Sequence, residues 1–243
     1  VYSLYGATRR PAPAMLRGLD ALVYDLQDLS IRCYTYVSTL RLVMEAAARA
    51  RIPVLVLDRG NPLMGVVDGP MLEPRFESFV GSFPGPLVYG LTSGQAARRL
   101  ARVLRLRIDL EVVGRGEATW SGHRWVSPSP GIRSPHTAWC YPVTVGFEAL
   151  PAVDYGRPGL LPFELIGCQE VDEQAMADRL NGEALPGMAF HPVVYEHKGV
   201  AWHGVRIAVL DPAAYRPVAA AVAALEVDRK STRLNSSHLV ISY

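Results

Sequence analysis

The hydrophobic pattern near the start of the chain predicts a strand, a helix and a second strand. A short apolar run, Ala21 to Tyr24, ends in acidic and amide residues, and a second run, Val54 to Leu57, ends in the same way. Parallel strands are joined by a crossover helix, and ligands of open α/β sheets bind where the strands end. The pattern therefore predicts both a parallel sheet and a small-molecule site at its carboxyl edge.

The intervening segment has helical periodicity. Apolar residues recur at three- and four-residue steps and define one face: Val37, Leu40, Met44, Ala47 and Ala48. Pro53 ends this helix. Because both strands are apolar throughout, we expect both faces of the sheet to be covered.

Further elements follow along the chain. Thr92 and Gln95 form a capping-box pattern, so we expect a helix whose buried side is Ala96, Ala97, Leu100, Val103 and Leu104. Residues 110–113 are an apolar run that predicts another strand. The Gly- and Pro-rich stretch 60–86 predicts a long loop, with Phe76 and Phe79 as its anchors.

The second half of the chain predicts a different arrangement. Residues 120–141 are aromatic- and proline-rich and predict an irregular segment at a domain boundary. Helices are expected at 172–180 and 217–225, and strands at 190–195 and 204–210. The predicted fold class is α/β: a Rossmann-like parallel-sheet domain over residues 1–119, incomplete at its N-terminus, and a smaller α+β domain over 120–229.

The last residues, 230–243, differ in composition from the rest of the chain. They contain no Pro, Gly or Ala and are rich in Ser. The segment resembles translated adapter or vector sequence, so we expect it to be artefactual; a genuine terminal strand is the alternative. Such a segment carries no information about function.

Composition excludes several classes of function. A net charge of +2 does not favour binding to nucleic acid, and no apolar run reaches the roughly 20 residues that span a bilayer. The three cysteines are too few and too scattered for a disulfide framework or a zinc site. His191, His197 and His203 are interrupted by Lys198-Gly199, so we expect no metal there, and nothing in the sequence predicts a cofactor.

Carboxylates beside amides, arginines and aromatic rings are the remaining candidates for chemistry. Asp25, Asp28 and Asp58 follow the predicted strands, and further along lie Glu148, Asp154 and Glu164. Two carboxyl groups suit glycoside cleavage, because one protonates the leaving oxygen and the other stabilises the anomeric centre. Aromatic rings match the C–H faces of sugars. The structural alternative is that Asp25 or Asp58 caps a segment or pairs with Arg32 or Arg59, and that Glu164 is a paired structural carboxylate.

Five segments carry a family resemblance: YSLYGATRRPAPAML, LVYDLQDLSIRCYTYVSTL, VLDRGNP, WVSPSP and PFELIG. They closely resemble the bacterial exo-β-N-acetylmuramidases of the NamZ type, from about Tyr2 to Ala220. The resemblance implies release of terminal N-acetylmuramic acid from the non-reducing end of peptidoglycan fragments in cell-wall recycling. It implies a cleft between two domains, muramic-acid saccharides as binding partners, and a secreted or periplasmic location.

The candidate site residues combine this resemblance with the chemistry above. Asp28 and Glu148 are the candidate catalytic residues. The candidate substrate-binding residues are Gln27, Arg32, Tyr36, Asp58, Asn61, Tyr141, Asp154 and Arg157. Asp154 and Arg157 match a family glutamate and arginine around Gly156.

The chain also departs from the family pattern. Ala149-Leu150-Pro151 replaces Gly-Thr-Asn, and Tyr89 stands where members usually carry a histidine. The family's Ser-Pro-Glu-His-Gly stretch has no counterpart and would lie ahead of Val1. We therefore expect weak or absent activity from this chain. The alternatives are a non-catalytic amino-sugar- or peptidoglycan-binding homologue, or a divergent α/β protein with another small ligand.

Overall fold

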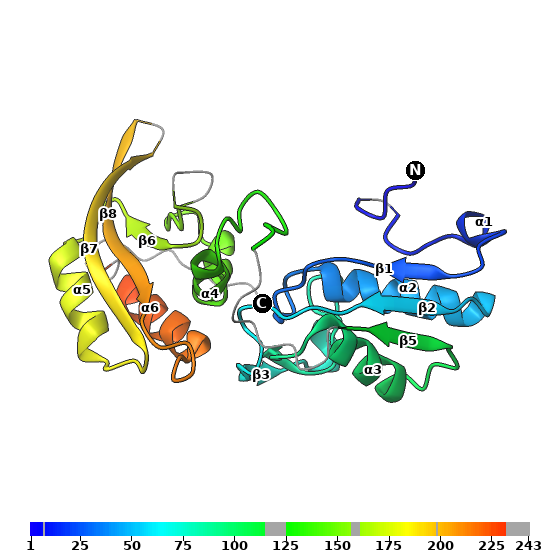
Figure 1. Cartoon of the computed structure of the whole chain (residues 1–243). Helices are drawn as coiled ribbons and strands as arrows, with labels where there is room; N and C mark the ends of the chain where they lie inside the picture. Colours follow the sequence, from blue (N-terminus) through cyan, green and yellow to red (C-terminus); the bar gives the residue numbers. More distant parts are fainter. Residues whose placement is uncertain (7, 115–124, 157–160, 198, 232–243) are drawn as a thin grey trace. The chain divides into compact units, whose positions relative to one another are not determined.

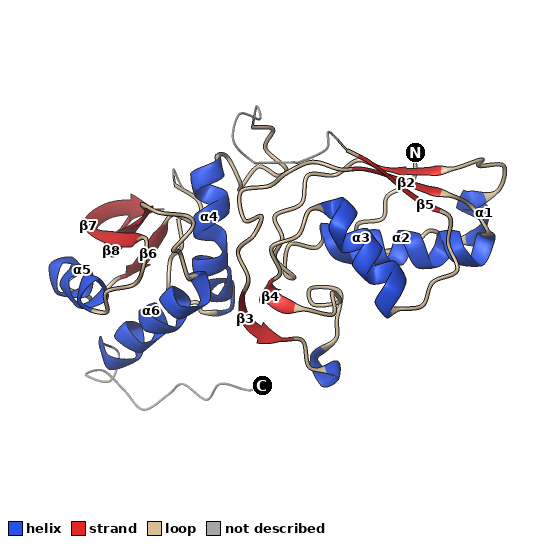
Figure 2. Ribbon diagram, turned by 60° about the horizontal axis from the view of Figure 1, so that its bottom comes forward, coloured by secondary structure: helices blue, strands red, loops and turns tan. Residues whose placement is uncertain are grey.

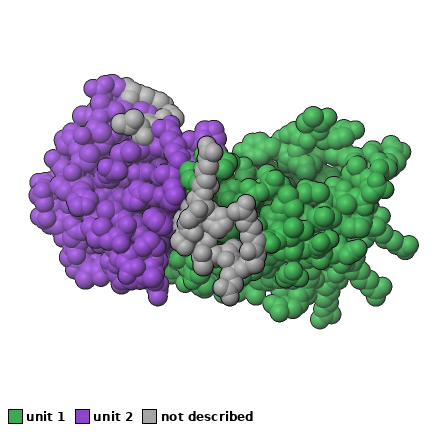
Figure 3. Space-filling model, in the orientation of Figure 1, with its two compact units in different colours: residues 1–128 green, residues 129–243 purple. Residues whose placement is uncertain are grey.

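A computed structural model describes the chain except for residues 7, 115–124, 157–160, 198 and 232–243 (Figure 1). It divides into two compact units, residues 1–128 and 129–243, which are coloured separately in Figure 3.

Unit 1 contains a parallel sheet with the strand order β1-β2-β5. Tyr24 pairs with Val56, and Val56 pairs with Val112, so the carboxyl ends of the three strands share one edge. The elements of unit 1 are α1 (Pro13–Leu16), β1 (Leu22–Tyr24), α2 (Tyr36–Ala50), β2 (Val54–Leu57), β3 (Asp68–Met71), the 3-10 helix η1 (Pro74–Phe76), β4 (Pro86–Val88), α3 (Ser93–Val103) and β5 (Leu110–Val113).

The predicted strand–helix–strand unit is confirmed. Helix α2 buries Val37, Leu40, Met44 and Ala47 against the sheet, and Arg51 ends it in a left-handed conformation two residues ahead of Pro53. Helix α3 carries the predicted capping box, in which Thr92 accepts from the Gln95 amide and the Gln95 side chain accepts from the Thr92 amide.

Two details of the parallel sheet differ from expectation. Helices α2 and α3 lie on the same face of the sheet (Figure 2), while Val23 and Val113 on its other face are 60% and 44% exposed. The prediction that both faces are covered is therefore wrong for these residues. Val103, the last residue of α3, is also exposed, at 46%, whereas Leu104 after it packs against the core.

The predicted long loop is more ordered than its composition suggested. Strands β3 and β4 pair antiparallel within it. Phe76, a predicted anchor, is 52% exposed, whereas Phe83 is 1% exposed and belongs to the core formed by α2, α3 and the sheet. Phe79 instead packs under the guanidinium of Arg9, 4.4 Å from the ring centroid.

Unit 2 contains an antiparallel sheet with the order β6-β8-β7. Helix α5 packs along β7 and β8, and the Asn181 side chain bonds both the amide and the carbonyl of Phe190 at 2.9 and 2.8 Å. Its elements are α4 (Pro135–Thr144), the 3-10 helix η2 (Val145–Ala149), β6 (Leu165–Cys168), α5 (Glu173–Gly182), β7 (Met188–His197), β8 (Val200–Val209) and α6 (Pro217–Ser231).

The predicted helices and strands of this half are confirmed, with longer strands and a longer last helix. The irregular segment, however, ends earlier than predicted. Ser134 accepts a hydrogen bond from the Thr137 amide and Pro135 occupies the first turn, so α4 begins before Tyr141. The interior Pro142 hides this helix from a propensity argument.

Candidate functional sites

The ends of β1 and β2 are tied together by polar side chains. Asp25 and Arg59 form an exposed ion pair, one of the structural alternatives considered for them. Gln27 donates its amide N–H to the carbonyl oxygens of Gly60, at 3.2 Å, and Asp28, at 3.0 Å. The two segments after the strands are thus held side by side at the carboxyl edge of the sheet.

Asp28 is the central residue of this edge and is only 3% exposed. Its Oδ2 accepts a short hydrogen bond from the Tyr89 hydroxyl. Its Oδ1 has no partner of full hydrogen-bond geometry among the described residues, although the amides of Leu29 and Ser30 lie near enough to favour the ionised form. Burial outweighs these hydrogen bonds and raises the pKa of Asp28 from 3.8 to about 6.

A buried network positions the segment that follows Asp28. Ser30 adopts a left-handed conformation (φ 57°), and its hydroxyl donates to the Leu91 carbonyl and to Asn61 Oδ1, the latter at 3.0 Å. Asn61 is 1% exposed and also bonds the Leu91 carbonyl and the Leu63 amide, both at 3.1 Å. The side-chain amide of Asn61 therefore has a structural role, since its oxygen and nitrogen both bond groups inside unit 1.

Arg32 and Tyr36 also make internal contacts. Arg32 is buried, and its Nη1 donates to the Gly85 carbonyl at 2.7 Å. Tyr36 begins α2, and its hydroxyl donates to the Pro128 carbonyl at 2.8 Å. Both side chains bond backbone groups of unit 1.

Asp58 binds the N-terminus of α3. Its Oδ1 accepts from the Gly94 amide and its Oδ2 from the Thr92 hydroxyl, both at 2.8 Å. A carboxylate is favourable at this end of a helix because of the unpaired amides and the helix dipole. Both oxygens of Asp58 thus have structural partners, as the capping alternative anticipated, but on a later helix.

The predicted residues of unit 2 lie in different environments. Glu148 is exposed on η2, whereas Tyr141 is buried on α4 with its ring 4.8 Å from that of Phe163. Arg157 lies outside the described residues. Glu164 is buried and accepts from the Thr137 hydroxyl at 2.7 Å and from Arg206 at 3.4 Å, as a paired structural carboxylate does.

Asp154 is 7% exposed and has three side-chain hydrogen bonds. Its Oδ1 accepts from the Gly156 amide at 2.6 Å and from the Tyr195 hydroxyl at 3.1 Å. Its Oδ2 lies 2.5 Å from Nδ1 of His197. Tyr195 reaches this position by passing over Gly167, where a Cβ would lie 2.3 Å from its hydroxyl.

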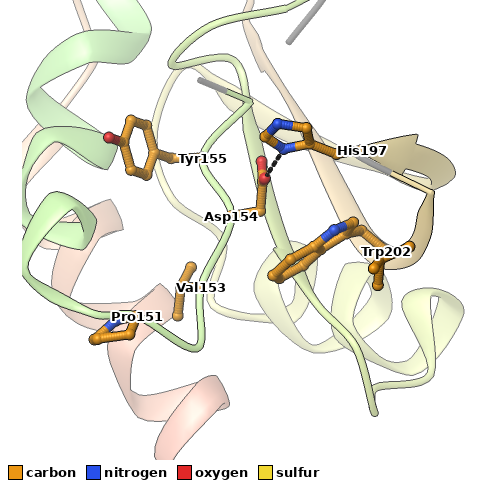
Figure 4. A pocket seen from close by; sticks show the side chains of 7 residues that line it. Pro151, Val153, Asp154, Tyr155, His197 and Trp202 are labelled. Atoms are coloured by element: carbon orange, nitrogen blue, oxygen red, sulfur yellow. Dashed lines mark hydrogen bonds and ion pairs between the residues drawn. The ribbon is translucent and has the colours of Figure 1, made fainter. Parts of the chain in front are cut away.

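A pocket of about 230 Å³ opens beside this carboxylate–imidazole pair. Figure 4 shows His197 and Trp202, from β7 and β8, on one side and Pro151 and Val153 from the preceding loop on the other. From the sequence, His197 was considered only as a metal ligand, and Trp202 was not among the candidate residues. The signal that could have found them is their place in the sequence. His197 lies just after one predicted strand, 190–195, and Trp202 just before the next, 204–210. Within the described part of the chain, no group of three His, Cys, Asp or Glu residues is arranged to hold a metal ion.

These features define a two-unit α/β chain with a buried carboxyl at a parallel-strand edge and a carboxylate–imidazole pair beside a small pocket. Two family models match it: "Exo-beta-N-acetylmuramidase NamZ, N-terminal" over residues 1–136 and the C-terminal model of the same family over 139–236. The chain therefore belongs to the NamZ family.

Relatives with known names and structures agree. The chain is 38% identical over 223 residues to "Peptidoglycan beta-N-acetylmuramidase NamZ" of Bacillus subtilis (strain 168), covering 87% of this chain and 54% of that protein. It resembles a solved DUF1343 family protein of Bacteroides fragilis (TM-score 0.86, 34% identity, 97% of this chain and 66% of that one). A second B. fragilis member shares the fold at 24% identity (TM-score 0.68, 93% and 71%).

The chain thus spans about half the length of the curated relative that it matches. No helix in the described ranges is long and apolar enough to cross a membrane.

Proposed function

We propose that this chain is part of a glycosidase of the exo-β-N-acetylmuramidase type. Its substrates are peptidoglycan fragments that end in N-acetylmuramic acid at the non-reducing end, and its setting is cell-wall recycling outside the cytoplasm. Membership of the NamZ family and the printed name of the B. subtilis relative support this proposal. Unit 1 is then a Rossmann-like domain, which its parallel sheet supports.

The observation that carries the proposal is the environment of Asp28. A glycosidase needs a carboxyl group that remains protonated near the working pH in order to protonate the leaving oxygen. Burial brings the pKa of Asp28 to about 6, and Tyr89 fixes one of its oxygens. Glu148 is the candidate second carboxyl group and is exposed.

A non-catalytic amino-sugar- or peptidoglycan-binding homologue is the second candidate, and burial is the observation that favours it. Asp28 is only 3% exposed, and the polar groups of Asp58 and Asn61 have partners inside unit 1. A catalytic carboxyl must reach its substrate, whereas a protein that only binds the sugar can contact it through other residues and leave Asp28 buried.

Release of a chromogenic group from a β-N-acetylmuramide, measured beside binding of N-acetylmuramic acid, separates the two candidates. If the glycosidase proposal is right, Asp28→Asn lowers the rate by about 10²–10⁴-fold. Glu226→Gln, an exposed α6 variant, is the control that leaves the rate unchanged. Saturable binding without release, by a version extended at its amino terminus, supports the second candidate, and release that is insensitive to Asp28→Asn rejects the proposed role of Asp28.

A further inference from the structure

The pocket of unit 2 has one wall of apolar side chains and one polar corner. Val153 and Pro151 come from the loop before β6, and Val200 and Trp202 come from β8. His197 and Asp154 form the polar corner. Figure 4 shows the indole of Trp202 and the imidazole of His197 on the same side of the Asp154 carboxylate. A flat aromatic face next to one polar group is typical of sites that bind a sugar ring.

Asp154 orients His197. Its Oδ2 lies 2.5 Å from Nδ1 of the imidazole, while its Oδ1 accepts hydrogen bonds from the Gly156 amide and the Tyr195 hydroxyl. Nε2 of His197 has no hydrogen-bond partner among the described residues and is the ring nitrogen left for a ligand. Asp154 therefore acts on a ligand through His197, which we assign as the contacting residue.

Trp202 lines the pocket with an aromatic ring. Its Nε1 is buried and has no acceptor within the described part of the chain. Because this nitrogen is enclosed, the group that Trp202 offers to a ligand in the pocket is the face of its indole ring. The rest of the indole is apolar surface.

The charge and size of the pocket restrict the ligand. Asp154 faces His197, and among the described residues no other charged side chain lines the pocket, so this lining offers a strongly anionic ligand no unpaired cation. A volume of about 230 Å³ is below the range of about 300–1,000 Å³ for drug-sized ligands and suits a single ring. The valines and Pro151 suit a methyl group, as in an acetamido substituent.

We propose that this pocket binds one N-acetylated amino-sugar ring, stacked on Trp202 and hydrogen-bonded by His197. The proposal rests on the proposed function, since it concerns the same class of cell-wall saccharide. It assigns to unit 2 a sugar subsite that is independent of Asp28.

Titration of the full chain with N-acetylglucosamine, followed by NMR of the indole N–H signals, tests the proposal. Trp202→Phe assigns the Trp202 signal, which should shift saturably in the wild type. We expect Trp202→Ala and His197→Ala to weaken binding about tenfold or more, because each removes a contact worth about 1.4 kcal/mol or more. His191→Ala, an exposed histidine on the same strand, should leave the dissociation constant unchanged.

Several outcomes would overturn the proposal in a chain that remains folded by circular dichroism. They are the absence of a shift with N-acetylglucosamine, a shift unaffected by both pocket variants, and equal binding of glucose, which lacks the acetamido group. Much tighter binding of anionic N-acetylmuramic acid would overturn the neutral ligand class. Asp28→Asn should leave this binding unchanged, so a failure of the glycosidase proposal is distinguishable from a failure of this one.

Discussion

The buried pair of Asp28 and Tyr89 couples the stability of unit 1 to pH. The pKa of Asp28 is about 6 in the folded chain against an ordinary value of 3.8, because burial penalises the charged form. The folded state therefore holds a proton that the unfolded state has released between these values. The contribution of this proton to the free energy of unfolding is fully present below about pH 4 and is lost as the pH rises through 6.

Asp28→Asn should remove this dependence, since an amide cannot ionise. We expect the variant to resemble the wild type in stability near pH 4 and to be more stable by up to about 3 kcal/mol at pH 8. Urea unfolding at a series of pH values measures the difference. Parallel curves for the two proteins would show that the burial of Asp28 carries no such cost.

Tyr89→Phe is the matched experiment on the hydrogen-bond donor. It removes the hydroxyl that favours the ionised carboxyl, so its destabilisation should grow as the pH rises through 6. Tyr24→Phe is the control, because the Tyr24 hydroxyl donates to the backbone carbonyl of Tyr36 at 2.9 Å. Its cost should not grow in that pH range.

At the scale of elements, the first turn of α3 lies close to the carboxyl ends of β2 and β5. A Cβ at Gly94 would lie 2.4 Å from Val112 Cγ1 and 2.6 Å from Asp58 Oδ2. Gly94 is therefore required for Asp58 to reach the first turn of α3. Gly182, in the last turn of α5, has no neighbouring atom within 4 Å of its Cβ position.

Gly94→Ala and Gly182→Ala should consequently have opposite effects, although both glycines are helical. Gly94→Ala displaces Asp58 or β5, and we expect a loss of about 1–3 kcal/mol, as for other overpacked sites. Gly182→Ala reduces the entropy of the unfolded chain and should stabilise by about 0.4–1 kcal/mol. Chemical denaturation of both variants checks this, and a stable Gly94→Ala protein would contradict the packing argument.

The sequence allowed prediction of elements whose signals are local. Helix α2, strand β2 and the capping box of α3 follow from periodicity, proline and cap residues within a few positions. Helix α4 was missed because its prolines conceal it, and the β3–β4 pairing because its strand signals are weak.

The candidate sites were less accessible to prediction for a related reason. The bond from Tyr89 to Asp28 spans 61 residues, and that from His197 to Asp154 spans 43. Such partners depend on how the strands are arranged in space. The sequence identified the carboxylates through their positions after strands and through family motifs, while the residues that contact them emerged only from the structure.

At the scale of the whole molecule, each unit has its own core. Met44 is fully buried among the α2, α3 and sheet residues of unit 1, and Ile207 is fully buried on β8 of unit 2. A chain with two separate cores need not unfold in a single two-state transition.

We therefore predict that calorimetry of the full chain resolves two unfolding transitions, one for each unit. Met44→Ala should lower the midpoint of one transition and Ile207→Ala that of the other, because each removes about 2–5 kcal/mol of packing from a different core. The Asp28→Asn variant assigns them, since at pH 8 it should raise the midpoint of the transition that Met44→Ala lowers. A single transition shifted equally by Met44→Ala and Ile207→Ala would show that the two units unfold together.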